Sequence, residues 1–286
     1  MRIDATDVRK TYGDVTALDG LSLTVPSGST FGIIGTNGAG KSTLFRLLVG
    51  HDRPDAGTVS VGGTDVTEDG RRIRERVGYL PEHVGFPDGL TGREVLGVHR
   101  AMRGLSKDGR TAEAIERVGL TADEADRRVS GYSNGMQRRL GLATVLLPDP
   151  DVLILDEPTA GLDPRGVDEF HAIVEEITSE TDATVVFCSH VLGEVERLCD
   201  RAAVLHDGRV RAAGSVGELA AEAEAAADHD GDSADRDGDS ATRSGRDRDG
   251  LRAAFREAVG DDAAHDARVG KGRADDATAD REEVAP

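Results

Sequence analysis

Lysine is scarce in this sequence, and arginine does not make up the deficit of positive charge. Four lysines stand beside 31 arginines, whereas aspartate and glutamate together number 54, which gives a formal net charge of −19 over 286 residues. Binding to nucleic acid through a basic face depends on Lys and Arg side chains that neutralise phosphates. We therefore expect no nucleic-acid partner for this chain.

Cysteine and long apolar runs are also nearly absent. Cys188 and Cys199 form no C-x-x-C pair, and Cys188 ends the apolar run 184–188, so we expect buried, reduced thiols in a cytosolic chain. No apolar stretch approaches the ~20 residues that a membrane-spanning helix needs. The first ten residues, MRIDATDVRK, lack the form of a signal peptide. Any membrane part of its process would then come from another chain.

We expect the surface of the protein to be dominated by acidic residues. An acidic, lysine-poor composition resembles that of cytoplasmic proteins from salt-loving (halophilic) microbes, where high salt screens self-repulsion. An ordinary acidic protein with an unusual tail is the alternative. Residues 221–286 are rich in Asp, Gly, Ser, Ala and Arg, and this composition cannot offset the entropy of ordering. We expect a disordered tail there, in which 251–259 is compatible with one short helix, a docking patch or neither.

A glycine-rich segment is the most informative motif. Residues 35–43 read GTNGAGKST and match G-x-x-x-x-G-K-[S/T], with an apolar strand-type run before them and leucines at helical spacing after them. In that context backbone N–H groups form an anion nest, Lys41 reaches the β- and γ-phosphates, and the Ser42 hydroxyl ligates Mg²⁺. A glycine-rich turn with a chance lysine is the alternative. The predicted phosphate-binding residues are Gly35, Thr36, Asn37, Gly38, Ala39, Gly40, Lys41, Ser42 and Thr43.

A second motif supplies carboxylates. The apolar run 152–155 ends in Asp156 and Glu157. A buried strand is a rigid platform, so Asp156 is predicted to hold Mg²⁺ while Glu157 faces the γ-phosphate and polarises the attacking water as a general base. The alternative is a core strand that runs into an acidic turn.

The order of patterns along the chain predicts an α/β fold. Strand patterns at 3–8 and 18–25 and a hairpin at 57–63 surround the glycine-rich loop, and a helical stretch at about 91–147 follows. A strand at 152–155, a helix at about 165–178 and a strand at 184–188 complete the pattern. Strands that alternate with helices imply a mostly parallel sheet. We expect one domain over 1–220, followed by the acidic tail.

Three segments together carry a family resemblance. Residues 152–164 read VLILDEPTAGLDP, residues 187–190 read FCSH, and residues 132–137 read YSNGMQ. They resemble the ATP-binding subunit of an ABC transporter of the single-domain exporter branch, with matching motifs from about Lys10 to Leu219. The resemblance implies a P-loop NTPase (RecA-like) core with an N-terminal antiparallel β subdomain and an inserted α-helical subdomain at about 86–147. It also implies ATP and Mg²⁺ as cofactors, and ATP hydrolysis that powers transport, with export the expected direction.

The same resemblance implies partners and roles for single residues. The expected assembly is a homodimer, or a heterodimer with a related subunit, held on the inner face of the membrane by transmembrane permease subunits. Tyr12 would stack on adenine, although it could be an ordinary exposed loop tyrosine. His190 would contact the γ-phosphate and sense its loss. Residues that would meet the nucleotide held by the second subunit, or join the two subunits, are Ser133, Asn134, Gly135 and Asp163.

The sequence departs from the common family pattern at two places. The signature segment is Tyr-Ser-Asn-Gly-Met-Gln where Leu-Ser-Gly-Gly-Gln is common, and Glu82 stands where many members have Gln. Glu82 is predicted to contact Mg²⁺, with an ordinary surface carboxylate as the alternative. Residues 86–96 and 100–104 resemble the ATPase of the copper-processing transporter that serves nitrous oxide reductase maturation, but drug, lipid or sodium export stays open. A soluble ABC-type ATPase and a P-loop small-molecule kinase are the competing classes.

Overall fold

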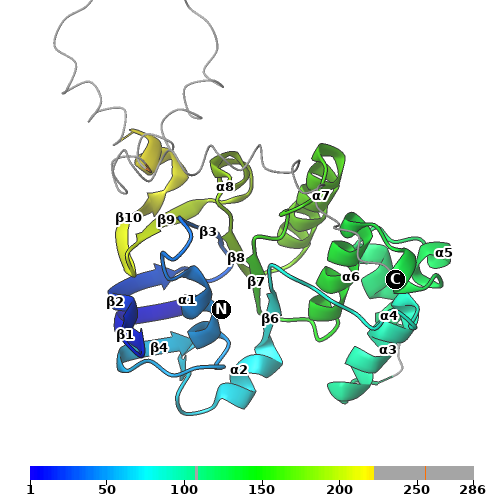
Figure 1. Cartoon of the computed structure of the whole chain (residues 1–286), viewed down its shortest axis with the longest axis horizontal. Helices are drawn as coiled ribbons and strands as arrows, with labels where there is room; N and C mark the ends of the chain where they lie inside the picture. The colour runs from blue at the N-terminus through cyan, green and yellow to red at the C-terminus, as the bar shows by residue number, and fades with distance from the viewer. Residues whose placement is uncertain (107–108, 222–254, 256–286) are drawn as a thin grey trace, which may run out of the picture.

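The computed structural model of the chain describes residues 1–106, 109–221 and 255. Two β-sheets lie side by side, and a group of helices extends from the larger sheet (Figure 1). Across these described residues, no helix combines the length and apolar character needed to cross a bilayer. The helix considered at 251–259 lies outside the described residues, except for Phe255, which is buried.

The N-terminal part forms an antiparallel sheet in the order β2-β1-β4-β5. Its strands are β1 (Ile3–Tyr12), β2 (Val15–Val25), β4 (Ala56–Val61) and β5 (Thr64–Asp65). Buried and outward-facing residues alternate along much of β1 and β2, as expected when one face of a sheet covers a core. Gly62 and Gly63 both have positive φ and form the turn between β4 and β5, so the predicted hairpin is present.

The larger sheet has the order β10-β9-β3-β8-β7-β6, and only the β9–β10 pair is antiparallel. The central strands β3 (Thr30–Gly35), β7 (Val152–Asp156) and β8 (Thr184–Cys188) are buried along their whole length, because their apolar runs are continuous. Asp156 pairs with Cys188, and Ile33 also pairs with Cys188. The ends of these three strands therefore bring the glycine-rich loop, the acidic pair and the Ser189-His190 turn to one edge.

Three strands of this sheet were not anticipated from the sequence. They are β6 (Val77–Leu80), β9 (Arg201–His206) and β10 (Arg209–Ser215). Both cysteines are buried and free, so the expectation of buried thiols is confirmed.

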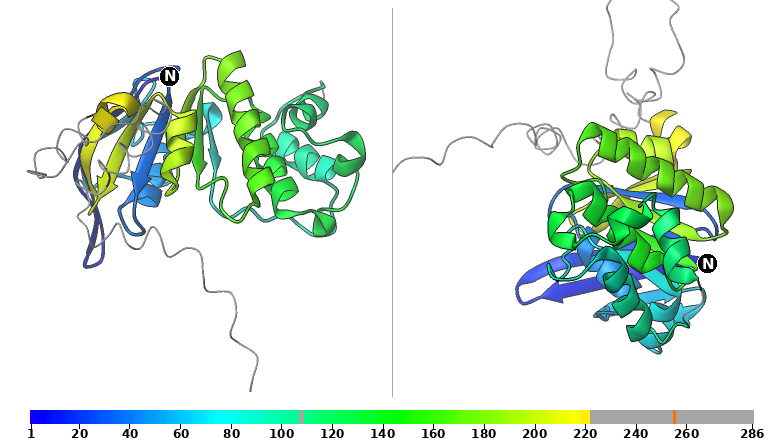
Figure 2. Two further views of the ribbon diagram at one scale, coloured as in Figure 1. Left: turned by 90° about the horizontal axis from the view of Figure 1, so that it is seen from above. Right: turned by 90° about the vertical axis from the view of Figure 1, so that its right-hand side faces the viewer.

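The inserted helices form the subdomain expected at about 86–147. Figure 2 shows them as a separate group at the end of the molecule opposite the antiparallel sheet. Thr91 and Glu94 form a capping box at the start of α3, and Ser133 caps α6. The subdomain consists of α3 (Gly92–Met102), α4 (Arg110–Arg117), α5 (Ala122–Ala125), the 3₁₀ turn η1 (Val129–Gly131) and α6 (Asn134–Leu146).

Further helices of the described residues accompany the two sheets. The predicted helix at 165–178 is α7 (Pro164–Glu180), which begins with Pro164 after the capping residue Asp163. Helix α1 (Lys41–Leu48) follows the glycine-rich loop directly. Helices α2 (Gly70–Arg76) and α8 (Leu192–Leu198) were not anticipated.

Candidate nucleotide site

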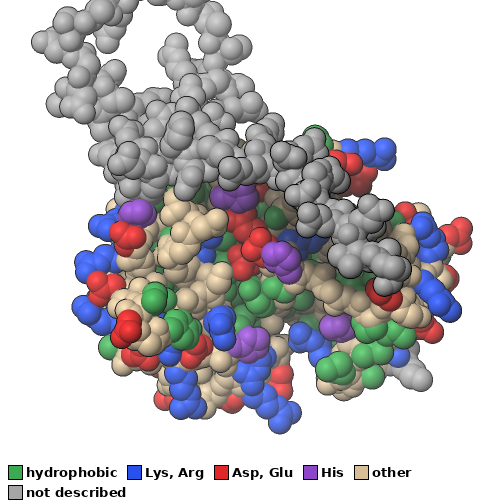
Figure 3. Space-filling model, viewed as in Figure 1, with side chains coloured by type: hydrophobic (Ala, Val, Ile, Leu, Met, Phe, Trp, Pro, Cys, Tyr) green, Lys and Arg blue, Asp and Glu red, His purple; other side chains and the backbone are tan. Residues whose placement is uncertain are grey.

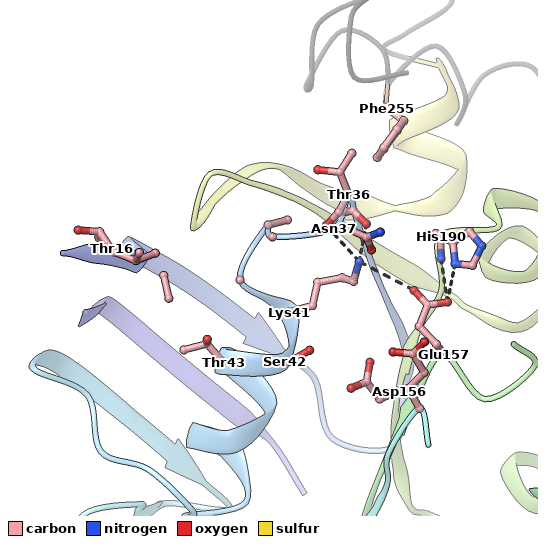
Figure 4. A pocket seen from close by; sticks show the side chains of 17 residues that line it. Thr16, Thr36, Asn37, Lys41, Ser42, Thr43, Asp156, Glu157, His190 and Phe255 are labelled. Carbon is pink, nitrogen blue, oxygen red and sulfur yellow. Dashed lines mark hydrogen bonds and ion pairs between the residues drawn. The ribbon is translucent and has the colours of Figure 1, made fainter. Parts of the chain in front are cut away.

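An open cleft of about 940 Å³ lies at the shared edge of β3, β7 and β8 (Figure 4). It brings together the whole predicted phosphate loop and four of the predicted polar residues from distant parts of the chain. Its lining consists of Val15, Thr16, Ala17, the loop 35–43, Glu82, Asp156, Glu157, His190 and Phe255.

The glycine-rich loop has the backbone that an anion site needs. Gly38 and Gly40 have φ of 83° and 103°, which side chains other than glycine rarely adopt. A Cβ on Gly40 would lie 2.6 Å from the carbonyl oxygen of Ala17, so close packing also requires glycine there. Since α1 begins at Lys41, within the segment 35–43, its free N–H groups add to an anion nest for phosphates.

Lys41 is almost buried, and its charge lies at the centre of the cleft. Its Nζ donates to the carbonyl oxygens of Gly35 and Thr36, and lies 3.9 Å from Oε1 of Glu157. A polyphosphate in the loop would lie beside this ammonium group. The position suits the predicted contact with the β- and γ-phosphates.

Asp156 ends β7 inside the cleft and is 6% exposed. Burial raises the pKa of its carboxyl, while the hydroxyl of Tyr79, which donates to Oδ2 at 3.1 Å, acts in the opposite direction. A divalent cation beside it would favour the ionised form. Ser42 and Glu82 line the same cleft, so the three predicted Mg²⁺ ligands lie in one cleft.

This set of donors fits Mg²⁺. The ion prefers oxygen ligands and usually keeps several waters, with one or two protein carboxylates and substrate phosphates completing its shell. Among the described residues no group of three or more His, Cys, Asp or Glu side chains is arranged to hold a metal, so a dedicated protein cage is absent there. Ser42 and Asp156 would hold the ion together with phosphate oxygens.

Glu157 follows β7 with a φ of 43°, a left-handed conformation that non-glycine residues rarely adopt. Its Oε2 accepts the backbone N–H of His190 at 3.3 Å and lies 2.7 Å from Nδ1 of the same residue. The hydrogen bond to Glu157 raises the pKa of His190. Figure 4 shows the Glu157 carboxylate between Lys41 and His190, joined by dashed lines to both. A carboxylate in this place can accept a proton from water next to the γ-phosphate position.

Five predicted site residues lie outside the cleft lining. Tyr12 is 41% exposed, its hydroxyl donates to Oδ2 of Asp52, and Nζ of Lys10 lies 5.3 Å from its ring centre. The other four belong to two turns on the surface, and are Ser133, Asn134, Gly135 and Asp163.

These two turns contact each other at the starts of two helices. Ser133 accepts the N–H of Met136 at 3.2 Å to cap α6, and Asp163 accepts the N–H of Gly166 at 2.7 Å to cap α7. Nδ2 of Asn134 donates to the carbonyl oxygen of Gly161 at 3.4 Å. Within one chain, therefore, the signature segment does not reach the cleft that holds the phosphate loop.

Several lining residues were missed from the sequence. Val15, Thr16 and Ala17 begin β2, just after Tyr12, and their closeness to that aromatic residue was the available signal. Phe255 lies in the segment 251–259 that was considered as a docking patch, but nothing in that pattern indicated that it would line the cleft.

Comparison with known proteins agrees with this geometry. Residues 18–160 match the family described as ABC transporter. The chain belongs to this family. It is 42% identical over 220 residues to the daunorubicin/doxorubicin resistance ATP-binding protein DrrA of Streptomyces peucetius, covering 76% of this chain and 66% of that protein. It is 38% identical over 208 residues to the bacitracin transport ATP-binding protein BcrA of Bacillus licheniformis, covering 73% and 68%.

The fold of the ABC subunit also matches a solved structure. CbiO1 from Clostridium perfringens, part of the ABC transporter complex cbiONQ, superposes with a TM-score of 0.70 at 30% identity, covering 79% of this chain and 93% of that one. The predicted P-loop NTPase fold with its two subdomains is thereby confirmed. The chain is an ATP-binding subunit of the ABC transporter family, and its reaction is ATP hydrolysis that drives transport. The narrower resemblance to the copper-processing branch stays a prediction.

Proposed function

We propose that two copies of this chain, or one copy and a related subunit, close head to tail around two molecules of Mg·ATP. The observation that carries the proposal is the separation between the cleft and the signature segment. The cleft holds the phosphate loop, Asp156, Glu157 and His190, whereas Ser133–Gly135 lie on another surface with their helix N-terminus exposed. A helix N-terminus favours a phosphate, and a second chain would supply one to it. Asp163 would lie at the interface between the two chains.

In the closed dimer each chain contributes half of each site. The loop N–H groups and Lys41 would bind the phosphates, and Ser42, Asp156 and Glu82 would hold Mg²⁺, which would neutralise phosphate charge. Glu157 accepts the proton of the attacking water, while His190 contacts the γ-phosphate. The γ-phosphate bridges the two chains, so hydrolysis removes that contact and the dimer opens.

The opening and closing would pass to membrane subunits through α3 and the Glu82 loop. Val98 and Met102 on α3 are 46% and 81% exposed, although both are apolar. In Figure 3 green side chains gather over the part of the surface where α3 lies. An exposed apolar patch of this kind suits a protein partner. The chain would then sit on the inner face of the membrane, as a peripheral subunit.

The cargo would be set by the membrane partner. Two relatives carry names of drug resistance and antibiotic transport, which favours export of an organic compound over the copper-processing role. A soluble ABC-type ATPase without a membrane partner is the second candidate, and the experiment below separates the two.

A tagged Glu157→Gln variant, purified from native membranes in molar KCl with Mg·ATP, tests the coupling. We expect a multi-span membrane protein to co-purify, and its identity narrows the cargo. The matched control carries Met102→Asp as well, and should lose the membrane protein but keep ATP binding. Recovery of soluble partners alone, with the ATP-dependent dimer still forming, would show that the ATPase is right and the transport coupling is wrong.

A further inference from the structure

We propose that Arg138 is a positioning residue for hydrolysis, which fixes the loop of Glu82 and the backbone of Glu157 relative to the signature helix α6. The inference rests on the proposed function of the cleft, since it assigns Glu157 as the general base. Arg138 lies in α6, close to the signature segment, and is 5% exposed. Burying a guanidinium group costs free energy unless its N–H donors are hydrogen-bonded. The hydrogen-bond partners of Arg138 therefore indicate the role of this side chain.

Both partners of Arg138 are backbone carbonyls of cleft loops. Nη1 donates to the oxygen of Pro81 at 2.7 Å, and Nη2 donates to the oxygen of Glu157 at 2.8 Å. Pro81 directly precedes Glu82. One planar group therefore holds the two loops that carry cleft carboxylates, and the rigid fork of the guanidinium sets their separation.

Arg138 donates to the carbonyl of Glu157, a residue whose backbone conformation is strained. Glu157 has a φ of 43°, and its own N–H donates to the carbonyl oxygen of Cys188 at 3.1 Å. Hydrogen bonds thus hold the residue on both sides: its N–H bonds to β8 and its carbonyl bonds to α6. Strained backbone of this kind persists only where the surroundings determine it. Without Arg138, the Glu157 carbonyl keeps only its local hydrogen bond from the N–H of Ala160 at 3.2 Å, and the carboxylate loses its fixed direction.

The charge of Arg138 is balanced without occupying the carboxylates. Burial lowers the pKa of the guanidinium, and the nearby charges of Glu82, Asp156 and Glu157 oppose that shift. Nη1 and Nη2 both donate to carbonyl oxygens rather than to those side chains. The carboxylates therefore stay available for Mg²⁺ and water. Arg138 attracts the nearby carboxylates but donates its hydrogen bonds to backbone carbonyls. This arrangement suits a positioning role and not a direct part in the reaction.

Because α6 starts at the signature segment, Arg138 also links two sites of the proposed dimer. Ser133 at the start of α6 would face the nucleotide of the second chain, while Arg138 on the same helix holds Glu157 of its own chain. A shift of α6 on closure would reach the catalytic carboxylate through this one side chain.

The test compares Arg138→Lys and Arg138→Met with the wild-type chain, in turnover and in ATP affinity. Lys keeps the charge but has no fork, and Met keeps the length without charge. We expect at least a tenfold fall in kcat for both variants, with the Kd for ATP within about twofold of wild type. The pKa of His190, which reports on Glu157 through their hydrogen bond, should move toward its ordinary value in both. Arg117→Lys is the matched control, because Arg117 joins the helical subdomain to Glu180 at 3.8 Å without touching a cleft loop.

Wild-type turnover in Arg138→Lys would overturn the inference, because charge alone would then suffice. Equal losses of ATP affinity and stability without a change at His190 would also overturn it, in favour of a structural role. If Arg138→Met does not fold, Arg138→Lys decides alone. Failure of the proposed function is distinct: the wild-type chain itself would release no phosphate from ATP, or Glu157→Gln would hydrolyse ATP at the wild-type rate.

Discussion

Nδ1 of His190 lies 2.7 Å from Oε2 of Glu157, at the adjacent carboxyl ends of the parallel strands β7 and β8. The two residues are 33 positions apart in the sequence, and adjacent parallel strands bring them together. This pair therefore couples the proposed general base to the proposed γ-phosphate sensor within one chain.

The pair predicts a pKa change in Glu157→Gln. The hydrogen bond and charge of Glu157 raise the pKa of His190, so removing the charge should lower it toward 6.5. Histidine ring signals followed by NMR titration measure the shift, and His190→Ala assigns the signal. In the wild-type protein the contact stabilises the fold fully below the ordinary histidine pKa, and this contribution fades as pH rises through the raised value. An unchanged titration would contradict the contact.

Tyr12 carries a prediction on nucleotide affinity. If its ring stacks on adenine, Tyr12→Ala should weaken ATP binding about tenfold, since stacking of a base on an aromatic ring contributes about 1–3 kcal/mol. Tyr12→Phe keeps the ring but loses the hydrogen bond to Asp52, and should lie near wild type. Calorimetry with ATP and with inorganic tripolyphosphate separates the effects, because only ATP has a base. Equal weakening of both ligands would contradict stacking.

A buried polar cluster around Glu194 predicts that the stability of the fold falls at acid pH. Ser189 and Thr159 donate to Oε2 of Glu194 at 2.7 and 2.9 Å, and Nε2 of His171 lies 3.6 Å from Oε1. Burial raises the pKa of Glu194, but these three contacts outweigh it and the net pKa is lowered. The stability that Glu194 contributes is thus present above its unfolded pKa and is lost as pH falls through the folded value.

Glu194→Gln should remove that part of the pH dependence, and Glu194→Ala should cost about 3 kcal/mol at neutral pH because buried donors lose their acceptor. Urea unfolding at pH 7 and at pH 4 measures both. The same pH dependence in Glu194→Gln as in wild type would show that other acids dominate.

The acidic composition predicts stabilisation by salt. With a net charge of −19, the folded chain repels itself, and the screening length falls from about 10 Å at 0.1 M salt to about 3 Å at 1 M. The melting temperature should therefore rise steeply between 0.1 and 2 M KCl. Sucrose at equal osmolality is the control for solute exclusion. A flat response to KCl, or an equal rise in sucrose, would contradict a salt-adapted surface.

Structure could be predicted from local sequence where a motif and its flanking residues form one continuous segment. The phosphate loop needed only its glycines and the flanking strand and helix, and the apolar runs of β3, β7 and β8 matched buried parallel strands. Strands β6 and β10 were not predicted because β6 spans only Val77–Leu80, and β10 lies at the edge of the sheet with a mixed pattern. Short or edge strands owe their conformation to neighbours rather than to their own period.

The position of Arg138 shows what sequence could not supply. Its sequence neighbours Gln137 and Arg139 suggest a polar helix surface, yet Arg138 is buried between two loops. Only the packing of α6 against β6 brings its donors to Pro81 and Glu157. The separation of Ser133 from the cleft of its own chain is likewise a tertiary property, invisible in the motif order.

The central claim is that the signature segment of one chain completes the cleft of another. Light scattering of Glu157→Gln with Mg·ATP tests it most directly. We predict twice the 30.1 kDa mass of one chain with ATP, a single-chain mass with ADP, and turnover lowered on the order of a hundredfold or more. The double variant with Ser133→Arg should bind ATP yet stay monomeric. A monomer that holds ATP in Glu157→Gln, or a dimer that Ser133→Arg leaves intact, would contradict the account.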